Sequence, residues 1–415
     1  MNLDEDLEEA AGSAALPGEV HPGVRRARAW LSRAVEPGTI DLWRYVEDVG
    51  PVDAVRRLRA GAAPERIRSL VGARAHEDAT LADLRRAGRC QARLVVPEDD
   101  EWPAWPLHAL TVAVAGEPLH HRDQSDRTRA PVPPLALWVR GPARLDAVTD
   151  RSVAVVGSRA SSAYGEHVAA ELGHQLGERG WTVVSGGAYG IDAAAHRGAL
   201  AAEAPTIAVL ACGVDRVYPA AHGALFARIA ESGLLVSEWP PGCAPLRHRF
   251  LVRNRLIAGL TRGTVVVEAA ARSGAHATAQ RARRLDRPLM VVPGPVTSAL
   301  SVGCHELLRD QEAGAVLVTS AAQVIEAVGG IGTDLAPAVE RPTSPRDGLS
   351  DIAARVLDAC PVRIGASPER LASVAGCDVL EVLKVLPSLE LADLVQWTGT
   401  GWRLSPPPER PGAAA

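Results

Sequence analysis

The sequence predicts an α/β protein built on an extended, doubly wound, mostly parallel sheet of the Rossmann-like type. Seven short, continuously apolar segments recur between residues 151 and 328, and helical patterns separate most of them. Strands that are apolar along their whole length are buried on both faces, as in a parallel sheet covered by helices. A small N-terminal helical domain and a C-terminal winged-helix-like domain are expected to flank this core.

The expected strands set the places where a ligand would bind. They are residues 153–156, 181–185, 206–212, 234–238, 264–270, 288–294 and 315–318, and "LALWVRG" is expected as a strand leading into the core. In open parallel sheets, ligands bind outside the carboxyl ends of the strands. The turns that follow these strands are therefore the candidate sites.

The chain of 415 residues is long enough for several domains. The expected order is a disordered acidic leader (1–20), a helical domain of the helix-hairpin-helix or SAM-like kind (21–90), a connecting segment (91–150), the Rossmann-like domain (151–328), a linker (329–349), the winged-helix-like domain (350–405) and a disordered tail (406–415). For residues 21–90, a hairpin that binds duplex backbone remains the alternative to a simple packed domain. The packed domain is favoured, because the break at Gly50-Pro51 lacks a glycine-rich hairpin loop.

Composition disfavours several functional classes. The acidic start does not resemble a secretory signal, and no run of about 18 apolar residues exists, so we expect a cytoplasmic protein without membrane contact. The six cysteines show no CxxC spacing, which predicts neither a zinc site nor a disulfide framework. Lys384 is the only lysine, so a lysine-dependent ATPase loop is absent and a Schiff-base lysine is disfavoured. No metal or cofactor is expected.

The turn after the first expected strand, residues 157–165, has the character of a phosphate site. It lacks GxGxxG, and the second strand ends at Ser185 rather than at an acid, which disfavours dinucleotide binding. The free N–H groups of the following helix favour an anion. The candidate ligating residues on this turn are Gly157, Ser158, Arg159 and Ser162.

The second turn, "SGGAYGID", is rich in glycine, which lets the backbone approach a ligand closely. Its candidate binding residues are Gly186, Gly187, Tyr189 and Gly190. Asp192 is expected to cap the next helix. His196 fits a place in the site and a place in the core equally well.

The third candidate is a stretch between Glu238 and Glu268 that contains no acidic residue. Within it lie Arg247, His248, Arg249, Arg253, Asn254, Arg255 and Arg262. A solvated face normally mixes both signs of charge. The stretch therefore predicts a surface that binds a polyanion.

The fourth turn follows the fifth main strand and carries Arg272, Ser273 and Gly274. An arginine beside a glycine turn and a new helix predicts an anion pocket. Glu268, at the end of the strand, is expected to orient an arginine rather than to act as a base, because no companion nucleophile is visible. No catalytic residue is predicted.

Taken together, these motifs resemble the DNA-processing protein A (DprA, also called Smf) family. The stretches that carry the resemblance are "VAVVGSRASSAYG", "VVSGGAYGIDAAAHRGAL", "TIAVLACGVDRVYP", "GLLVSEWPPGCAP", "FLVRNRLIAGL", "VVVEAAARSGAHATA" and "VVPGPVTSALSVGCHELL", which span about residues 152–318. The resemblance implies a dimeric protein that binds single-stranded DNA and has no established catalytic activity. It also implies protection of strands during natural transformation and loading of the RecA recombinase onto strands covered by single-strand-binding protein.

Carried over by motif, the resemblance assigns DNA binding to Arg159 in "GSR", to Arg253 and Arg255 in "RNR", and to Arg272 in "RSG". Tyr189 stands where the family usually has a basic residue, and it is suited to stacking on a base. The alternative is a Rossmann-like nucleotide hydrolase of the phosphoribohydrolase type. The stretch "PGPVTSALS" disfavours it, since it lacks that class's GT and glutamate.

The third helix of the C-terminal unit is unusually acidic for a DNA-reading helix. This helix and its continuation carry Asp378, Glu381, Glu390 and Asp393 against one Lys384, and Pro387 is expected to interrupt the segment. Acids facing a phosphate backbone would repel it. We therefore expect residues 350–405 to bind protein rather than DNA, with a self-contained stabilising module as the alternative.

Overall fold

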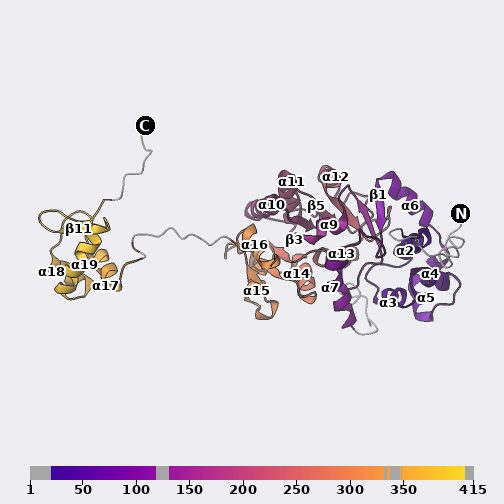
Figure 1. The fold of residues 1–415 in the computed structure, drawn as a ribbon, viewed down its shortest axis with the longest axis horizontal. Coiled ribbons are helices and arrows are strands. Elements are labelled where there is room, and N and C mark those ends of the chain that lie inside the picture. Colours follow the sequence, from indigo (N-terminus) through magenta and orange to yellow (C-terminus); the bar gives the residue numbers. More distant parts are fainter. Residues whose placement is uncertain (1–19, 118–129, 331–333, 337–345, 347, 407–415) are drawn as a thin grey trace. The chain divides into compact units, whose positions relative to one another are not determined.

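The structure is a computed structural model that describes residues 20–117, 130–330, 334–336, 346 and 348–406. The chain divides into two compact units, Met1–Ala336 and Pro337–Ala415 (Figure 1). Residues 1–19 of the expected leader, most of the linker and the tail after residue 406 lie outside the described residues. No helix within the described ranges is long and apolar enough to cross a membrane.

Nine strands of the described chain form one sheet in the order β1-β2-β6-β5-β4-β3-β7-β8-β9. They are β1 (Ala92–Val95), β2 (Leu137–Arg140), β3 (Ser152–Val156), β4 (Thr182–Ser185), β5 (Thr206–Val209), β6 (Leu234–Ser237), β7 (Thr264–Val266), β8 (Leu289–Val291) and β9 (Val316–Leu317). All seven predicted core strands form, and β3 to β9 pair in parallel. Residues 91–150 add two antiparallel strands at one end of the sheet: β2, which lies within the expected strand "LALWVRG", and the edge strand β1, which the sequence analysis did not predict.

The strand order creates a switch point beside β3. From β3 the chain moves through β4 and β5 to β6, and then returns to place β7 on the other side of β3. The crossover connections that leave β3 and β7 therefore diverge, and a crevice opens between them at the carboxyl ends of the strands. The turns after β3 and β7 border this crevice.

Helices cover both faces of the sheet, which explains the continuous apolar strands. They are α7 (Ala104–Ala115), α9 (Leu145–Asp150), α10 (Ala163–Glu178), α11 (Ile191–Ala201), α12 (Gly223–Ser232), α13 (Arg247–Gly259), α14 (Ala275–Arg284), α15 (Val302–Arg309) and α16 (Ala321–Val328), with 3₁₀ turns at Ala220–His222 and Gln311–Ala313. Ala154 and Val156 of β3 join a core with α7, α13 and α14. Val153 and Val155 point to the opposite face and pack against α10, α11 and α16.

The N-terminal helices belong to the same compact unit as the sheet. They are α2 (Pro22–Ala34), α3 (Ile40–Val49), α4 (Pro51–Arg59), α5 (Glu65–Val71) and α6 (Thr80–Arg89), with a 3₁₀ turn at Gly72–His76. They share a small core of their own that includes Trp30, Leu42 and Val55. Ala29 and Ala87 pack instead against Trp138 of β2, which joins the helices to the edge of the sheet.

The C-terminal unit has the element order of a winged helix. Helices α17 (Asp351–Ala359), α18 (Pro368–Ala375) and α19 (Val379–Leu391) precede a hairpin of β10 (Val395–Trp397) and β11 (Trp402–Leu404). The expected interruption at Pro387 was wrong, because α19 continues through this residue. Pro387 is exposed, whereas Val382, Leu386 and Leu389 of the same helix are fully buried. The packing of these three side chains holds the helix together across the proline.

Candidate nucleic-acid interface

An open cleft of about 420 Å³ lies at the switch point of the sheet. The predicted residues that line it are Gly157, Ser158, Arg159, Arg253, Asn254, Arg272, Ser273 and Gly274. The structure thus brings together the turns after β3 and β7 with one face of α13. Phe250 and Leu251 of α13 also line the cleft, and the sequence analysis missed both as site residues.

The two exposed arginines of the cleft are Arg159, after β3, and Arg272, after β7. Neither forms an ion pair with a described residue. The guanidinium carbon of Arg159 lies 5.5 Å from the centre of the Phe250 ring, within the range of a cation–π contact. Both guanidinium groups are therefore available for forked hydrogen bonds to phosphate oxygens.

Arg253 lines the same cleft but is turned toward the protein, with 4% of its surface exposed. Its Nη1 donates to the carbonyl oxygen of Gly186, at 2.9 Å, and to that of Val209. Burial lowers the pKa of Arg253 to about 10, so the side chain remains charged at neutral pH. Arg253 holds the glycine-rich turn after β4 and places a positive charge beside the cleft.

Asp192 also holds the glycine-rich turn, whereas the sequence predicted a helix cap. The cap position of α11 is Gly190, and the Asp192 Oδ2 accepts from the backbone N–H groups of Gly186, at 3.2 Å, and Ala188, at 3.3 Å. Burial raises the pKa of Asp192. Its carboxylate is committed to shaping the turn.

Gly190 interlocks the turn after β4 with the turn that carries Arg159. Its φ is +75°, and a Cβ at this position would lie 2.4 Å from the carbonyl oxygen of Ser158. Both the backbone angle and the close approach require glycine here.

Gly190→Ala is expected to destabilise the first unit by about 1–3 kcal/mol, because it combines backbone strain with overpacking against a backbone oxygen. Gly274→Ala is the matched control, since Gly274 lines the same cleft with open space around the added Cβ. Urea unfolding of both variants measures the difference. Equal stability of the two variants would contradict the interlocking of the turns.

The remaining glycine-turn residues and Ser162 lie around the cleft rather than on its wall. Tyr189 is 48% exposed, and its ring meets the His222 ring edge-on at 4.7 Å. Gly186 accepts the Arg253 hydrogen bond, and Gly187, with a φ of +63°, packs against Phe226. Ser162 caps α10, because its Oγ accepts from the Gly165 N–H at 3.1 Å.

Glu268 binds Ser162 rather than an arginine, which corrects the expected role. Its carboxylate accepts from the Ser162 N–H, at 2.9 Å, and from the Ser162 Oγ, at 2.5 Å. Strands β3 and β7 are neighbours in the sheet, so Glu268, which follows β7, lies beside the start of α10, where Ser162 supplies both donors. Glu268 therefore joins the two turns that carry Arg159 and Arg272.

The acid-free stretch does not form the expected continuous basic surface. Acids from other parts of the chain pair with its arginines: Arg249 with Glu36 at 2.5 Å, Arg255 with Glu238 at 2.6 Å, and Arg262 with Asp150 at 3.0 Å. The prediction that Arg255 binds DNA is not supported by this geometry, because Arg255 is 1% exposed and faces away from the cleft. Arg247 is the arginine of this stretch that remains exposed and has no ion pair with a residue that the structure describes.

His196 belongs to the core. It is fully buried, its Nδ1 lies 2.8 Å from the Thr206 Oγ1, and burial lowers its pKa to about 3. Its ring is therefore neutral at physiological pH and has no access to a ligand. Within the described residues, no group of three or more His, Cys, Asp or Glu side chains is arranged to hold a metal ion.

Comparisons with known proteins agree with this arrangement. The family model described as DNA recombination-mediator protein A matches residues 94–329. The DprA relative of Mycobacterium tuberculosis is 48% identical over 380 residues, which cover 91% of this chain and 94% of the relative. The DNA processing protein DprA of Streptococcus pneumoniae is 43% identical over 192 residues, which cover 46% of this chain and 66% of the relative.

The crystal structure of the Streptococcus pneumoniae DprA superimposes with a TM-score of 0.58. The sequence identity is 30%, and the superposition covers 73% of this chain and 96% of that one. The residues matched by the family model include part of β1, all of β2 to β9 and the residues that line the cleft. The chain belongs to the DNA recombination-mediator protein A (DprA/Smf) family.

Proposed function

We propose that this protein binds single-stranded DNA in the cleft at the switch point and acts there without catalysis. The observation that carries the proposal is the pair of exposed arginines, Arg159 and Arg272, which border one cleft from two neighbouring turns and have no ion pair within the described residues. Forked guanidinium groups suit phosphate oxygens better than lysine would. Arg253 adds a buried positive charge on the same side.

Aromatic side chains near the arginines favour a single strand over a duplex. Phe250 lines the cleft, the ring of Tyr218 lies 5.4 Å from it, and Tyr218 and Tyr189 are about half exposed. Bases stack on such rings only when they are released from their own neighbours in the strand. A positive groove with aromatic rings is the usual arrangement for binding unpaired strands with little sequence preference.

Family membership supports the biological role that we propose. As a recombination mediator, the protein would protect single strands, help load the RecA recombinase and meet single-strand-binding protein on the same strands. We place these events in the cytoplasm and infer that the protein works as a homodimer. Hydrolysis of nucleotides is disfavoured, since Asp192, the one carboxylate among the described residues that line the cleft, is committed to backbone N–H groups.

The proposal is tested by fluorescence anisotropy with a labelled 20-nucleotide oligo(dT) and a duplex of the same length. The single strand should bind more tightly, and log K should fall linearly with log salt, by about 0.7 per neutralised phosphate. Equal affinity for the duplex, or affinity independent of salt, would contradict the proposal. Release of base from a nucleoside monophosphate would favour the hydrolase instead.

A chain ending at Ala336 is expected to keep most of the affinity for single-stranded DNA. The C-terminal unit has its own core, and α19 exposes the apolar side chains of Leu380, Leu383 and Leu391 between acidic residues. Asp378 and Glu381 are already engaged in capping α19. We therefore infer that this unit contacts protein, and a large loss of affinity by the shortened, folded chain would show that it contacts DNA.

A further inference from the structure

We infer that Glu36, in the N-terminal helical segment, is a positioning residue for the DNA cleft: it fixes the first turn of α13, which carries Phe250 to the cleft wall. This inference rests on the proposed function. Glu36 lies in the connection between α2 and α3, far from the cleft in sequence, and it does not line the cleft. Its effect on DNA would therefore be exerted through α13.

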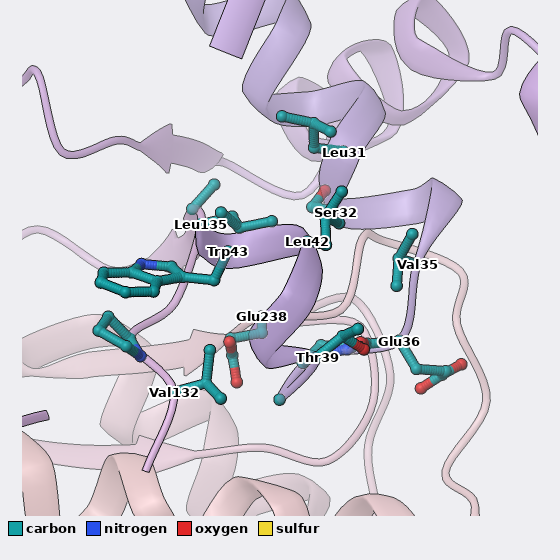
Figure 2. Close-up of a pocket in the computed structure, with 14 residues that line it drawn as sticks. Leu31, Ser32, Val35, Glu36, Thr39, Leu42, Trp43, Val132, Leu135 and Glu238 are labelled. Carbon is teal, nitrogen blue, oxygen red and sulfur yellow. The ribbon is translucent and has the colours of Figure 1, made fainter. Parts of the chain in front are cut away.

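Glu36 and Glu238 line a small pocket where the N-terminal helices meet the sheet, opposite the apolar side chains of Leu31 and Leu42 (Figure 2). The connection itself is fixed, since the Thr39 Oγ1 donates to the Glu36 carbonyl oxygen at 2.8 Å. Each of the two carboxylates binds an arginine of α13. This pocket is thus the place where the N-terminal segment holds the arginine-bearing helix.

The Glu36 carboxylate accepts hydrogen bonds from Trp239, at the start of the loop before α13, and from Arg249, in the first turn of that helix. Its Oε1 accepts from the Arg249 Nη2 at 2.5 Å, and its Oε2 accepts from the Arg249 Nε at 3.2 Å and from the Trp239 Nε1 at 3.0 Å. Burial opposes ionisation, but the hydrogen bonds from Arg249 and Trp239 outweigh it and lower the pKa of Glu36. A forked, charge-assisted contact of this kind also fixes the orientation of the arginine.

Arg249 passes this restraint to the start of α13. The helix begins after Leu246, whose side chain makes no capping hydrogen bond. The residue at the cap position therefore does not fix the first turn of α13. Arg249 supplies an anchor, because its Nη1 donates to the Ala244 carbonyl oxygen at 2.8 Å and its guanidinium carbon lies 5.4 Å from the Trp239 ring centre. The buried Arg249 thus joins the loop, the tryptophan and the helix.

Phe250 connects this anchor to the cleft. It packs in a small apolar cluster with Ala211, Trp239 and Val252, and it is the ring over which Arg159 lies. A shift in the first turn of α13 would therefore move both a candidate stacking ring and the guanidinium that rests on it. Loss of the Glu36 contact should disturb DNA binding without removing any DNA contact.

The sign of the effect distinguishes positioning from charge. Removing an acidic residue near a DNA site ordinarily strengthens binding, because the field becomes more positive. Positioning predicts the opposite: Glu36→Ala should weaken binding of a labelled 20-nucleotide oligo(dT) about tenfold, the range of one charged hydrogen bond. Glu36→Gln, which keeps one acceptor, should lose less, and the slope of log K against log salt should stay at the wild-type value.

Glu98→Ala is the matched control. Glu98 holds the buried Arg28 of α2 at 2.7 Å, so it also anchors the N-terminal helices, but its partner is not on α13. Its loss should lower the melting temperature and leave affinity for oligo(dT) unchanged. The double variant Glu36→Ala/Arg249→Ala should bind no more weakly than Arg249→Ala, because each substitution breaks the same contact between Glu36 and Arg249.

The outcomes separate the two proposals. If wild-type protein fails to bind oligo(dT), the proposed function fails. If wild-type protein binds and Arg159→Ala weakens binding, but folded Glu36→Ala and Glu36→Gln bind as tightly as wild type or more tightly, only the positioning role of Glu36 is overturned. A change in salt slope for Glu36→Gln would also overturn it, since that would mean a lost phosphate contact.

Discussion

Replacing Arg159 and Arg272 together by alanine is expected to lower the affinity for single-stranded DNA by about a hundredfold or more at moderate salt. Each guanidinium would lose a charged hydrogen bond worth about 1.5–3 kcal/mol, and about 1.4 kcal/mol corresponds to a factor of ten. The two side chains lie on separate turns, so their effects should largely add. Stability should be unchanged, because both side chains are exposed and neither is in an ion pair within the described residues.

The salt dependence identifies the lost contacts as phosphate contacts. The slope of log K against log salt should fall by about 0.7 for each arginine removed. Arg159→Lys and Arg272→Lys should restore part of the affinity, because the charge remains but the fork is lost. Arg56→Ala on α4, which removes an arginine that does not line the cleft, controls for net charge. Unchanged binding by the double alanine variant would remove both residues from the site.

The sheet and the two turns that matter most could be predicted because they depend on local sequence. An apolar strand buried on both faces leaves a clear signal, and the residue after it must lie at the carboxyl edge. Arg159 and Arg272 follow such strands, so the sequence alone places them at one edge. The sequence does not show whether their side chains are paired with acids in the fold. The absence of an ion pair to either arginine among the described residues supports their availability for a ligand.

The arginines of α13 show why the rest could not be predicted. A stretch without acids looks like a basic surface. In the folded protein, however, an arginine is neutralised by any acid that lies near it, including acids from distant parts of the chain. Arg249 finds its carboxylate at Glu36, more than two hundred residues earlier, and Arg255 finds one at the end of β6. Nothing in the sequence marks which arginines of "RHRFLVRNR" point inward, or that the phenylalanine among them faces the cleft.

Glu238→Ala is expected to destabilise the first unit by about 3–5 kcal/mol, the cost of leaving a buried charge without its partner. Arg255 is 1% exposed, and its Nη2 donates to the Glu238 Oε1 at 2.6 Å. Its Nε and Nη1 are buried and have no hydrogen-bond partner among the described residues, so the glutamate is what compensates this guanidinium. Without Glu238, α13 would have to move to hydrate Arg255, and the cleft wall that it carries would move with it.

Urea unfolding followed by tryptophan fluorescence measures this loss, with Asp53→Ala as the control. Asp53 pairs with Arg56 on the surface of α4, where both side chains are about half exposed, and such pairs are worth about 0–1 kcal/mol. The double variant Glu238→Leu/Arg255→Met should recover most of the stability, because an apolar pair of similar volume carries no desolvation cost. If Glu238→Ala loses no more stability than Asp53→Ala, the buried pair is not what holds α13 against the sheet, and the apolar contacts of the helix and the Arg249–Glu36 pair must hold it instead.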